Sequence, residues 1–226
     1  MADPARLARI GDAVRARLLA DPRAAAHGGH RADIFTLPGF TTPGECGALI
    51  AAIDAAAVPS TLYADGGRPG IRTSSTHYFR TEPIALALVW RLDALLGLER
   101  AQAEPMQGQR YREGEEYRHH CDFFRTTRSH WQRERLRGGQ RTWTAMLYLD
   151  AVAAGGATDF PRLARSFEPT PGLLLVWNNM DRAGRPNPVM LHAGMPVRAG
   201  VKHVVTQWYR SGAWSAASDV VAGPQI

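Results

Sequence analysis

Residues 111–124 read YREGEEYRHHCDFF and place two histidines, a cysteine and an aspartate in four consecutive positions. The stretch is rich in aromatic residues and has no helix cap before it, so we predict that it is extended. Successive side chains of a strand point to opposite faces. His120 and Asp122 therefore share one face, and His119 and Cys121 share the other. A zinc site built from all four residues would need both faces at once, which a strand does not supply.

Short β-rich segments separated by Gly and Pro turns continue outward from this stretch to about residue 212. They read AEPMQGQRYR, EYRHHCDFF, RTWTAMLYLD, GGATDFP, GLLLVWNN, VMLHAG and VKHVVTQWYR. Regular short strands of this kind are typical of a β-sandwich or barrel. Because helices precede them, we predict a mainly β fold with N-terminal helices (α+β), in which a jelly roll is braced by helices.

Three helices are predicted before the β-rich part. The first twenty residues have apolar side chains at helical spacing, namely Leu7, Ile10, Val14, Leu18 and Leu19. A short strand, DIFTLPGF, follows. A second helix begins with Thr42, Pro43 and Glu45, which is the pattern of a capping box with proline at the first helical position. Residues 81–98, TEPIALALVWRLDALLGL, give the third helix, with a threonine at its start.

Length and composition favour a globular chain. The 226 residues, 45% hydrophobic and 21% charged, are expected to form one domain, with a helical extension over residues 1–30 and a β core over 102–212. No signal-peptide core and no stretch long enough to span a bilayer are apparent, so we expect no membrane partner. Two cysteines, Cys46 and Cys121, lack a metal or redox spacing. A cytoplasmic location is therefore expected.

The net charge of +6 raises the possibility of nucleic-acid binding. The charge is spread along the chain, however, and comes from 26 arginines against one lysine, so no nucleic-acid partner is expected. The densest basic run, residues 125–141, is predicted to be a loop or short helix between strands. A solvated face is the favoured interpretation of this run, and a rim that attracts an acidic partner is the alternative.

His120 and Asp122 form two thirds of a facial triad of two histidines and one carboxylate, the site that binds non-haem Fe(II). Two polar residues on a solvated sheet face would give the same pattern. A second histidine from the β-rich part would have to be His130, His192 or His203. His130 lies in the basic run, where nothing would hold it rigidly.

Ten residues after His192 comes Lys202, the only lysine in the chain. Arginine stands at every other basic position, so this lysine suggests that its geometry matters. A compact ammonium at the end of a flexible stem suits the binding of a carboxylate in a confined pocket.

The residues now resemble a family. Tyr111, Gly114, Tyr117, His120 and Asp122 form the pattern Y-x-x-G-x-x-Y-x-x-H-x-D, which is similar to the prolyl 4-hydroxylase branch of the 2-oxoglutarate- and Fe(II)-dependent dioxygenases. RTSS, GGQRTWTAMLYLD, GGATDFP and LHAGMPVRAGVKHVVTQW resemble the same family, in the expected order, from about residue 34 to residue 210. The fold implied by the resemblance is a double-stranded β-helix, a kind of jelly roll, in agreement with the strand pattern.

The resemblance implies an iron site and a cosubstrate site. The implied iron ligands are His120, Asp122 and His192. In the implied cosubstrate site, 2-oxoglutarate chelates Fe(II) and Lys202 pairs with its far carboxylate, while two further residues donate or accept hydrogen bonds, Tyr111 and Thr158. Ascorbate is implied as a reductant.

The resemblance also implies a substrate site lined by Tyr117, Arg141 and Trp208, with a loop over residues 63–75 that closes on a bound peptide. The chain departs from the family pattern at Ala157, Asn187 and His203. No implied ligand is among them, so they bear on the identity of the substrate. His119, His130 and His203 are expected to lie at the surface or just outside the site.

The implied activity is hydroxylation of prolyl residues in a peptide or protein, with release of succinate and CO2. The alternative is hydroxylation of a free amino acid or another small molecule by the same iron chemistry, because a fold does not fix a substrate. A jelly roll that only binds ligands would ordinarily have lost a triad residue or the lysine. This chain keeps all four.

Overall fold

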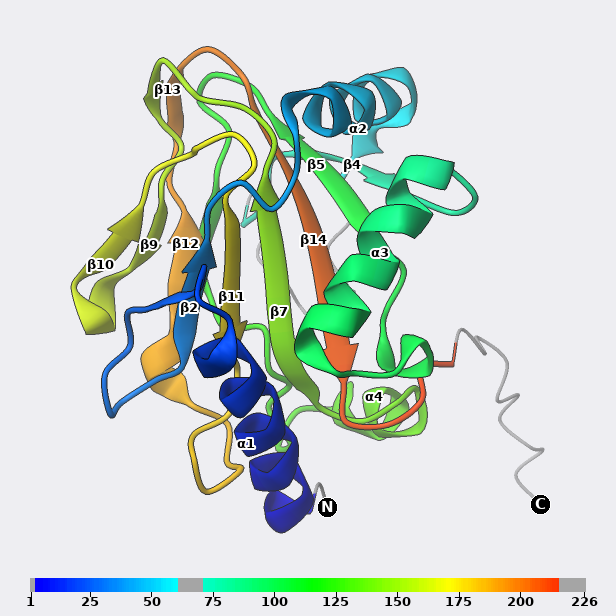
Figure 1. Cartoon of the computed structure of the whole chain (residues 1–226), viewed down its shortest axis with the longest axis vertical. Helices are drawn as coiled ribbons and strands as arrows, with labels where there is room; N and C mark the ends of the chain where they lie inside the picture. Colours follow the sequence, from blue (N-terminus) through cyan, green and yellow to red (C-terminus); the bar gives the residue numbers. More distant parts are fainter. Residues whose placement is uncertain (1–2, 61–70, 216–226) are drawn as a thin grey trace.

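The computed structural model describes residues 3–60 and 71–215. Its centre is a sheet of eight antiparallel strands in the order β1-β2-β11-β7-β14-β5-β4-β3, and three helices cover one face of this sheet (Figure 1). The strands of this sheet are β1 (Ala25–Ala26), β2 (Ile34–Leu37), β11 (Leu174–Asn178), β7 (Arg141–Tyr148), β14 (Lys202–Arg210), β5 (Gln107–Tyr111), β4 (Ser75–Tyr78) and β3 (Val58–Pro59). The helices are α1 (Pro4–Ala20), α2 (Pro43–Ala56) and α3 (Pro83–Leu96).

A smaller sheet faces the other side of the large one. Its order is β10 (Arg165–Phe167), β9 (Thr158–Phe160), β12 (His192–Gly194) and β6 (Tyr117–His120). The remaining elements are the pair β13 (Val197–Ala199) and β8 (Ala154–Gly155), the helix α4 (Trp131–Leu136), and three short 3₁₀ turns, η1 (Arg100–Gln102), η2 (Pro161–Leu163) and η3 (Pro188–Met190). Two facing antiparallel sheets with helices outside are the expected jelly roll.

The central strand β14 is buried along its whole length because each of its faces meets a different layer. Val205 and Tyr209 belong to the core between sheet and helices, together with Leu49 of α2 and Leu88 of α3. Val204 belongs to a second core between the two sheets. Alternation along one strand thus separates a structural core from the layer that carries the site.

The predicted helices form. In α2, the Thr42 hydroxyl accepts from the Glu45 N–H at 3.2 Å, and the Glu45 carboxylate accepts from the Thr42 N–H at 2.8 Å, which completes the capping box. The third helix departs from expectation at its start, because its N-cap is Glu82 and no side chain caps it. The basic run contains α4, and the predicted loop over residues 63–75 lies mostly outside the described residues. Within the described part, no helix is both long and apolar enough to cross a bilayer.

Candidate active site

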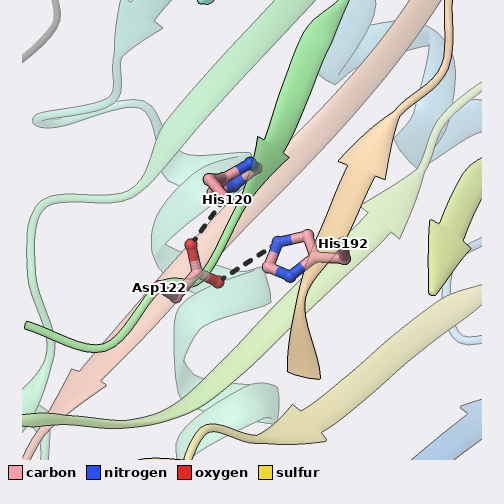
Figure 2. Close-up of side chains that lie close together, drawn as sticks. All are labelled: His120, Asp122 and His192. Atoms are coloured by element: carbon pink, nitrogen blue, oxygen red, sulfur yellow. Dashed lines mark ion pairs between the residues drawn. The ribbon is translucent and has the colours of Figure 1, made fainter. Parts of the chain in front are cut away.

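The smaller sheet brings the two predicted histidine ligands together. His120 is the last residue of β6 and His192 is the first of β12, and the antiparallel register of these strands makes them direct partners. Asp122 lies two residues beyond His120 and turns its carboxylate between the two rings (Figure 2). Its Oδ1 is 3.6 Å from His120 Nε2, and its Oδ2 is 3.8 Å from His192 Nε2. One ligand atom from each residue lies within 4.8 Å of the others.

Backbone carbonyls fix the tautomer of both rings. His120 Nδ1 is 2.8 Å from the Arg118 carbonyl, and His192 Nδ1 is 2.9 Å from the Met190 carbonyl. A carbonyl only accepts, so each Nδ1 carries the proton and donates it. Each Nε2 is left with a lone pair that points toward Asp122, which is the arrangement of metal-binding histidines.

The charges at this cluster suit a cation. Burial lowers the pKa of His192 to about 4, with a further contribution from His120, so the His192 imidazole is neutral at pH 7. Burial would raise the pKa of Asp122, but His192 and His120 outweigh it and the pKa falls below its usual range. Thr144 of β7 donates to Asp122 Oδ2 at 2.8 Å, and Asn179 in turn donates to the Thr144 hydroxyl at 2.9 Å.

These groups fit Fe(II). Two imidazole nitrogens and one carboxylate, converging from one side, form the facial set of non-haem iron sites. Within residues 3–60 and 71–215, no other cluster of three or more histidine, cysteine or acidic side chains has this geometry. His119 and Cys121 point elsewhere, as strand alternation predicted. His119 is half exposed and lies 3.7 Å from the Asp159 carboxylate, and burial raises the pKa of the Cys121 thiol to about 11.

Lys202 lies on the opposite wall of the same cavity, at the start of β14. Its ammonium is buried, donates to the Gly156 carbonyl at 2.6 Å, and lies 5.3 Å and 5.4 Å from the ring centres of Tyr111 and Tyr148. Burial lowers its pKa to about 8. No carboxylate of the described residues forms an ion pair with it, so the site suits a ligand that brings its own carboxylate.

The two remaining residues assigned to 2-oxoglutarate also line this cavity. Tyr111 comes from the end of β5, where it is the register partner of Lys202. Thr158 comes from β9, and its hydroxyl lies 2.6 Å from the Tyr148 hydroxyl. The structure therefore brings together the three residues predicted for the cosubstrate.

Of the residues expected to line the substrate site, Tyr117 stacks on His120 with ring centres 3.6 Å apart. The Arg72 guanidinium lies 5.2 Å from the centre of the same Tyr117 ring. Trp208 lines the cavity from β14 and its indole N–H has no partner. Arg141 was expected to line this site as well. It lies against Trp208, 4.4 Å from the ring centre, and its charge acts on both Asp122 and Tyr117 of the cavity.

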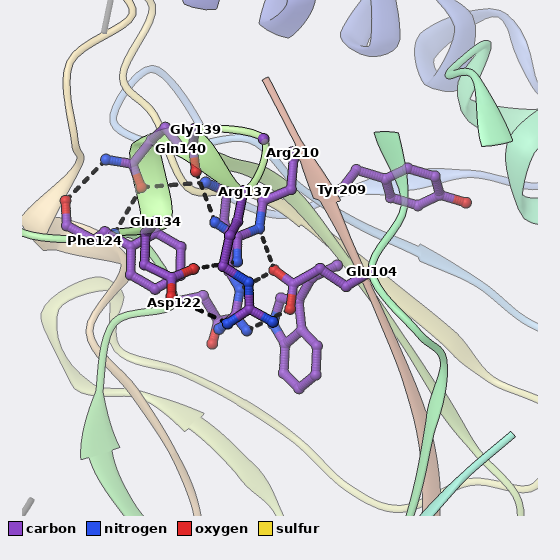
Figure 3. A network of polar contacts seen from close by, with 12 residues as sticks. Glu104, Asp122, Phe124, Glu134, Arg137, Gly139, Gln140, Tyr209 and Arg210 are labelled. Carbon is purple, nitrogen blue, oxygen red and sulfur yellow. Dashed lines mark hydrogen bonds and ion pairs between the residues drawn. The ribbon is translucent and has the colours of Figure 1, made fainter. Parts of the chain in front are cut away.

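Arg141 is held there by a buried network of charges, of which Figure 3 shows Glu104, Glu134 and Arg210. Glu104 accepts from Arg141 Nε at 2.6 Å and from Nη2 at 2.8 Å. The same carboxylate accepts from Arg210 at 2.5 Å, and Arg210 donates to Glu134 of α4 at 2.6 Å. Burial would raise the pKa of Glu104, but the two arginines lower it. The network joins α4 to the strand that carries Trp208.

Several site residues were not predicted from the sequence. Thr144 contacts a ligand, and further residues line the cavity, among them Gln109, Trp177 and Thr206. Arg72 also lines it and belongs to the loop that the resemblance implied. Strand alternation could have found Thr206, because it has the same parity as Lys202 and Trp208 on β14. Nothing in the local sequence could have placed Thr144 or Trp177 beside residues of another sheet.

His203 does not lie at the surface but follows Lys202 directly on β14, just outside the cavity. It is buried on the helix-covered face of β14, with Asp150 and Asp54 as partners. His130 is the N-cap residue of α4, outside the cavity.

Comparison with known proteins agrees with this geometry. Residues 106–210 match the family model described as the 2OG-Fe(II) oxygenase superfamily. Prolyl 4-hydroxylase 1 of Arabidopsis thaliana is 30% identical, over 80% of this chain and 70% of that protein. Prolyl 4-hydroxylase subunit alpha-1 of Rattus norvegicus is 35% identical over 127 residues, and the match spans 24% of that subunit's length.

Among solved structures, the viral collagen prolyl hydroxylase of Paramecium bursaria Chlorella virus-1, in its 2OG complex, superimposes with a TM-score of 0.63. It is 27% identical and the match covers 82% of this chain and 99% of that one. A prolyl-4-hydroxylase of Pseudomonas putida, 20% identical with a TM-score of 0.57, shares the fold, over 90% of this chain and 98% of that one. The chain belongs to the 2-oxoglutarate- and Fe(II)-dependent oxygenase superfamily, in its prolyl 4-hydroxylase-like branch.

Proposed function

We propose that this chain hydroxylates prolyl residues of a peptide or protein, using Fe(II), O2 and 2-oxoglutarate and releasing succinate and CO2. The observation that carries the proposal is one cavity with two walls. The two histidines and Asp122 converge on one wall, and the buried Lys202 ammonium lies on the other. A metal-bound ligand with a distal carboxylate fits between them.

Each residue has a defined task in this proposal. His120 and His192 would hold iron through their Nε2 atoms and Asp122 through its carboxylate, while the carbonyls behind both rings keep the lone pairs directed inward. Bound iron and 2-oxoglutarate supply the oxygen chemistry. Lys202 would neutralise the far carboxylate of the cosubstrate and set its orientation. Trp177, buried beside His192 with ring centres 4.9 Å apart, excludes water from the iron side.

A prolyl target is supported by the substrate wall and by the relatives. Tyr117 and Trp208 offer aromatic surfaces to an apolar ring. The relatives that match over most of this chain are prolyl 4-hydroxylases by name. Burial raises the pKa of Tyr117 to about 12, so its hydroxyl stays protonated and can donate to a substrate carbonyl.

One observation favours a second candidate, hydroxylation of a free amino acid. Arg72 lines the cavity, and its hydrogen-bond partners are the hydroxyls of Ser74 and Thr76 rather than a carboxylate. A guanidinium whose partners among residues 3–60 and 71–215 are neutral hydroxyls can take the α-carboxylate of a small substrate.

The test is an incubation of the purified chain with Fe(II), 2-oxoglutarate and a lysate from cells that lack this protein. Succinate is measured alongside peptide mass spectrometry, and Asp122→Ala serves as the inactive control. Enzyme-dependent oxygen addition at particular prolines is the expected result. Succinate that depends on small-molecule extracts, with no modified peptide, would favour the amino-acid hydroxylase instead.

A further inference from the structure

His203 follows Lys202 on β14 but points to the opposite face, where both of its ring nitrogens meet carboxylates. Its Nδ1 is 2.5 Å from Asp150 Oδ2, and its Nε2 is 3.1 Å from Asp54 Oδ1. Its backbone N–H also donates to Asp150 Oδ1 at 2.8 Å. Asp150 thus contacts both the backbone N–H and the ring of His203.

Two carboxylate partners require two N–H donors, so the geometry corresponds to a protonated imidazole. Burial alone would lower the pKa of His203, but the hydrogen bonds to Asp150 and Asp54 outweigh it and raise the pKa. The surrounding charges balance: Asp150 comes from the β7–β8 connection, Asp54 from α2, and Arg110 of β5 donates to Asp54 at 2.7 Å. The buried histidine therefore connects β14 to α2 and to the β7–β8 connection through compensated charge.

The segment of residues 150–156 contacts both His203 and Lys202. Asp150 lies in the connection from β7 to β8, and Gly156 directly follows β8, with its carbonyl accepting from the Lys202 ammonium at 2.6 Å. A backbone bond from Leu149 N–H to the His203 carbonyl, at 3.0 Å, secures the start of the segment. Consecutive residues of β14 therefore contact both ends of the segment 150–156, which includes the short strand β8.

We propose that His203 is a positioning residue for the cosubstrate site. Through Asp150 it fixes the segment of residues 150–156, and this segment keeps the Gly156 carbonyl where it accepts from the Lys202 ammonium. The identity of the bound anion as 2-oxoglutarate rests on the proposed function. The positioning itself is a property of the chain without ligand.

Because Lys202 is the only lysine, incorporating lysine labelled with ¹³C at the ε carbon gives one NMR resonance, which reports on this ammonium alone. The pKa of the Lys202 ammonium, followed through that resonance, and the dissociation constant of 2-oxoglutarate are measured for the wild type, for His203→Leu and for His203→Asn. An asparagine amide can still donate to Asp150, whereas leucine cannot. His77→Leu is the matched control. His77 also pairs with a carboxylate, since its Nε2 lies 2.7 Å from Glu82 Oε1, but it does not line the cavity.

In His203→Leu, the Lys202 resonance should move toward that of a solvated lysine and its pKa should rise. The dissociation constant of 2-oxoglutarate should increase about tenfold, with kcat at saturating cosubstrate nearly unchanged. His203→Asn should recover part of both effects, and the His77 variant should show neither. Folded His203→Leu protein with an unchanged Lys202 resonance and pKa would overturn the proposal.

If His203→Leu does not fold, Asp150→Asn provides a second test: the amide oxygen can still accept from the His203 N–H, but the charge that pairs with the imidazole is lost. The readout is then the chemical shift of Lys202 and not its pKa, because the Asp150 charge itself raises that pKa. Asp150→Asn should shift the Lys202 resonance in the same direction, and an unchanged resonance would again refute the positioning role. If no variant, including the wild type, binds 2-oxoglutarate, the proposed function fails, while the lysine resonance still decides whether His203 positions Lys202.

Discussion

Raising the pH from 7 to 9 should weaken 2-oxoglutarate binding and stabilise the ligand-free protein at the same time, because both effects come from Lys202. Burial lowers the pKa of this ammonium to about 8 in the folded chain, against an ordinary value of 10.5. The unfolded chain therefore holds a proton that the folded chain releases between these values. The free energy of unfolding consequently rises with pH across this window.

The two magnitudes are equal and opposite. With a pKa of about 8, the charged fraction of Lys202 falls about tenfold between pH 7 and pH 9, and an anion that needs the charged form loses affinity by about tenfold. The same proton release adds about 1.4 kcal/mol to the free energy of unfolding over that interval. Lys202→Met removes the titrating group and should abolish both changes.

Two assays measure the effects separately. Urea unfolding of the ligand-free protein at several pH values and constant ionic strength gives the stability change, and titration with 2-oxoglutarate in the presence of Mn(II) gives the affinity. Every other titrating group is common to wild type and Lys202→Met, so the difference between the two proteins isolates Lys202. Equal pH slopes in both proteins, or an affinity that stays constant to pH 9, would refute the assigned role.

Three further predictions follow from the site. Thr144→Val removes the hydroxyl that donates to the buried Asp122 carboxylate, so the affinity for Co(II) should fall by about 10–100-fold while the circular dichroism stays unchanged. Unchanged Co(II) affinity would show that this hydrogen bond does not contribute to metal binding. Glu104→Gln removes the carboxylate charge that Arg141 and Arg210 share, which leaves Arg210 with Glu134 alone, and it should destabilise the fold by about 3–5 kcal/mol in urea unfolding. A loss as small as that of an exposed glutamate variant would contradict the network's importance. His192→Ala should abolish Fe(II)-dependent turnover while the thermal transition persists, and retained 2-oxoglutarate consumption would disprove the triad.

The sequence predicted the parts of this protein that depend on local rules. The capping box of α2 is complete within four residues, and alternation along one strand separated His120 and Asp122 from His119 and Cys121. The resemblance to a family then supplied His192 and Lys202, which no local pattern could connect to them. The structure brings these residues to one cavity.

What the sequence could not predict depends on contacts between distant segments. The short strands β1, β3, β10 and β13 have two or three residues each and form because a neighbouring strand offers hydrogen bonds, so their own composition shows little. Arg141 looked like one arginine among many, and only the fold reveals its bidentate pair with Glu104, 37 positions away. For His203 the sequence left open the surface or a position just outside the site, because a lone histidine carries no local sign of two carboxylates from other elements.

The central claim is that the iron-ligand set His120, Asp122 and His192 and the Lys202 ammonium form one oxygenase site that hydroxylates proline. Its most direct test is a reaction under isotopically heavy O2 with a proline-containing peptide found by the lysate experiment. We predict one heavy oxygen in the hydroxylated proline, one in succinate, and equal amounts of the two products. Hydroxyproline oxygen that comes from water, or succinate formed at the same rate by Asp122→Ala, would contradict the account.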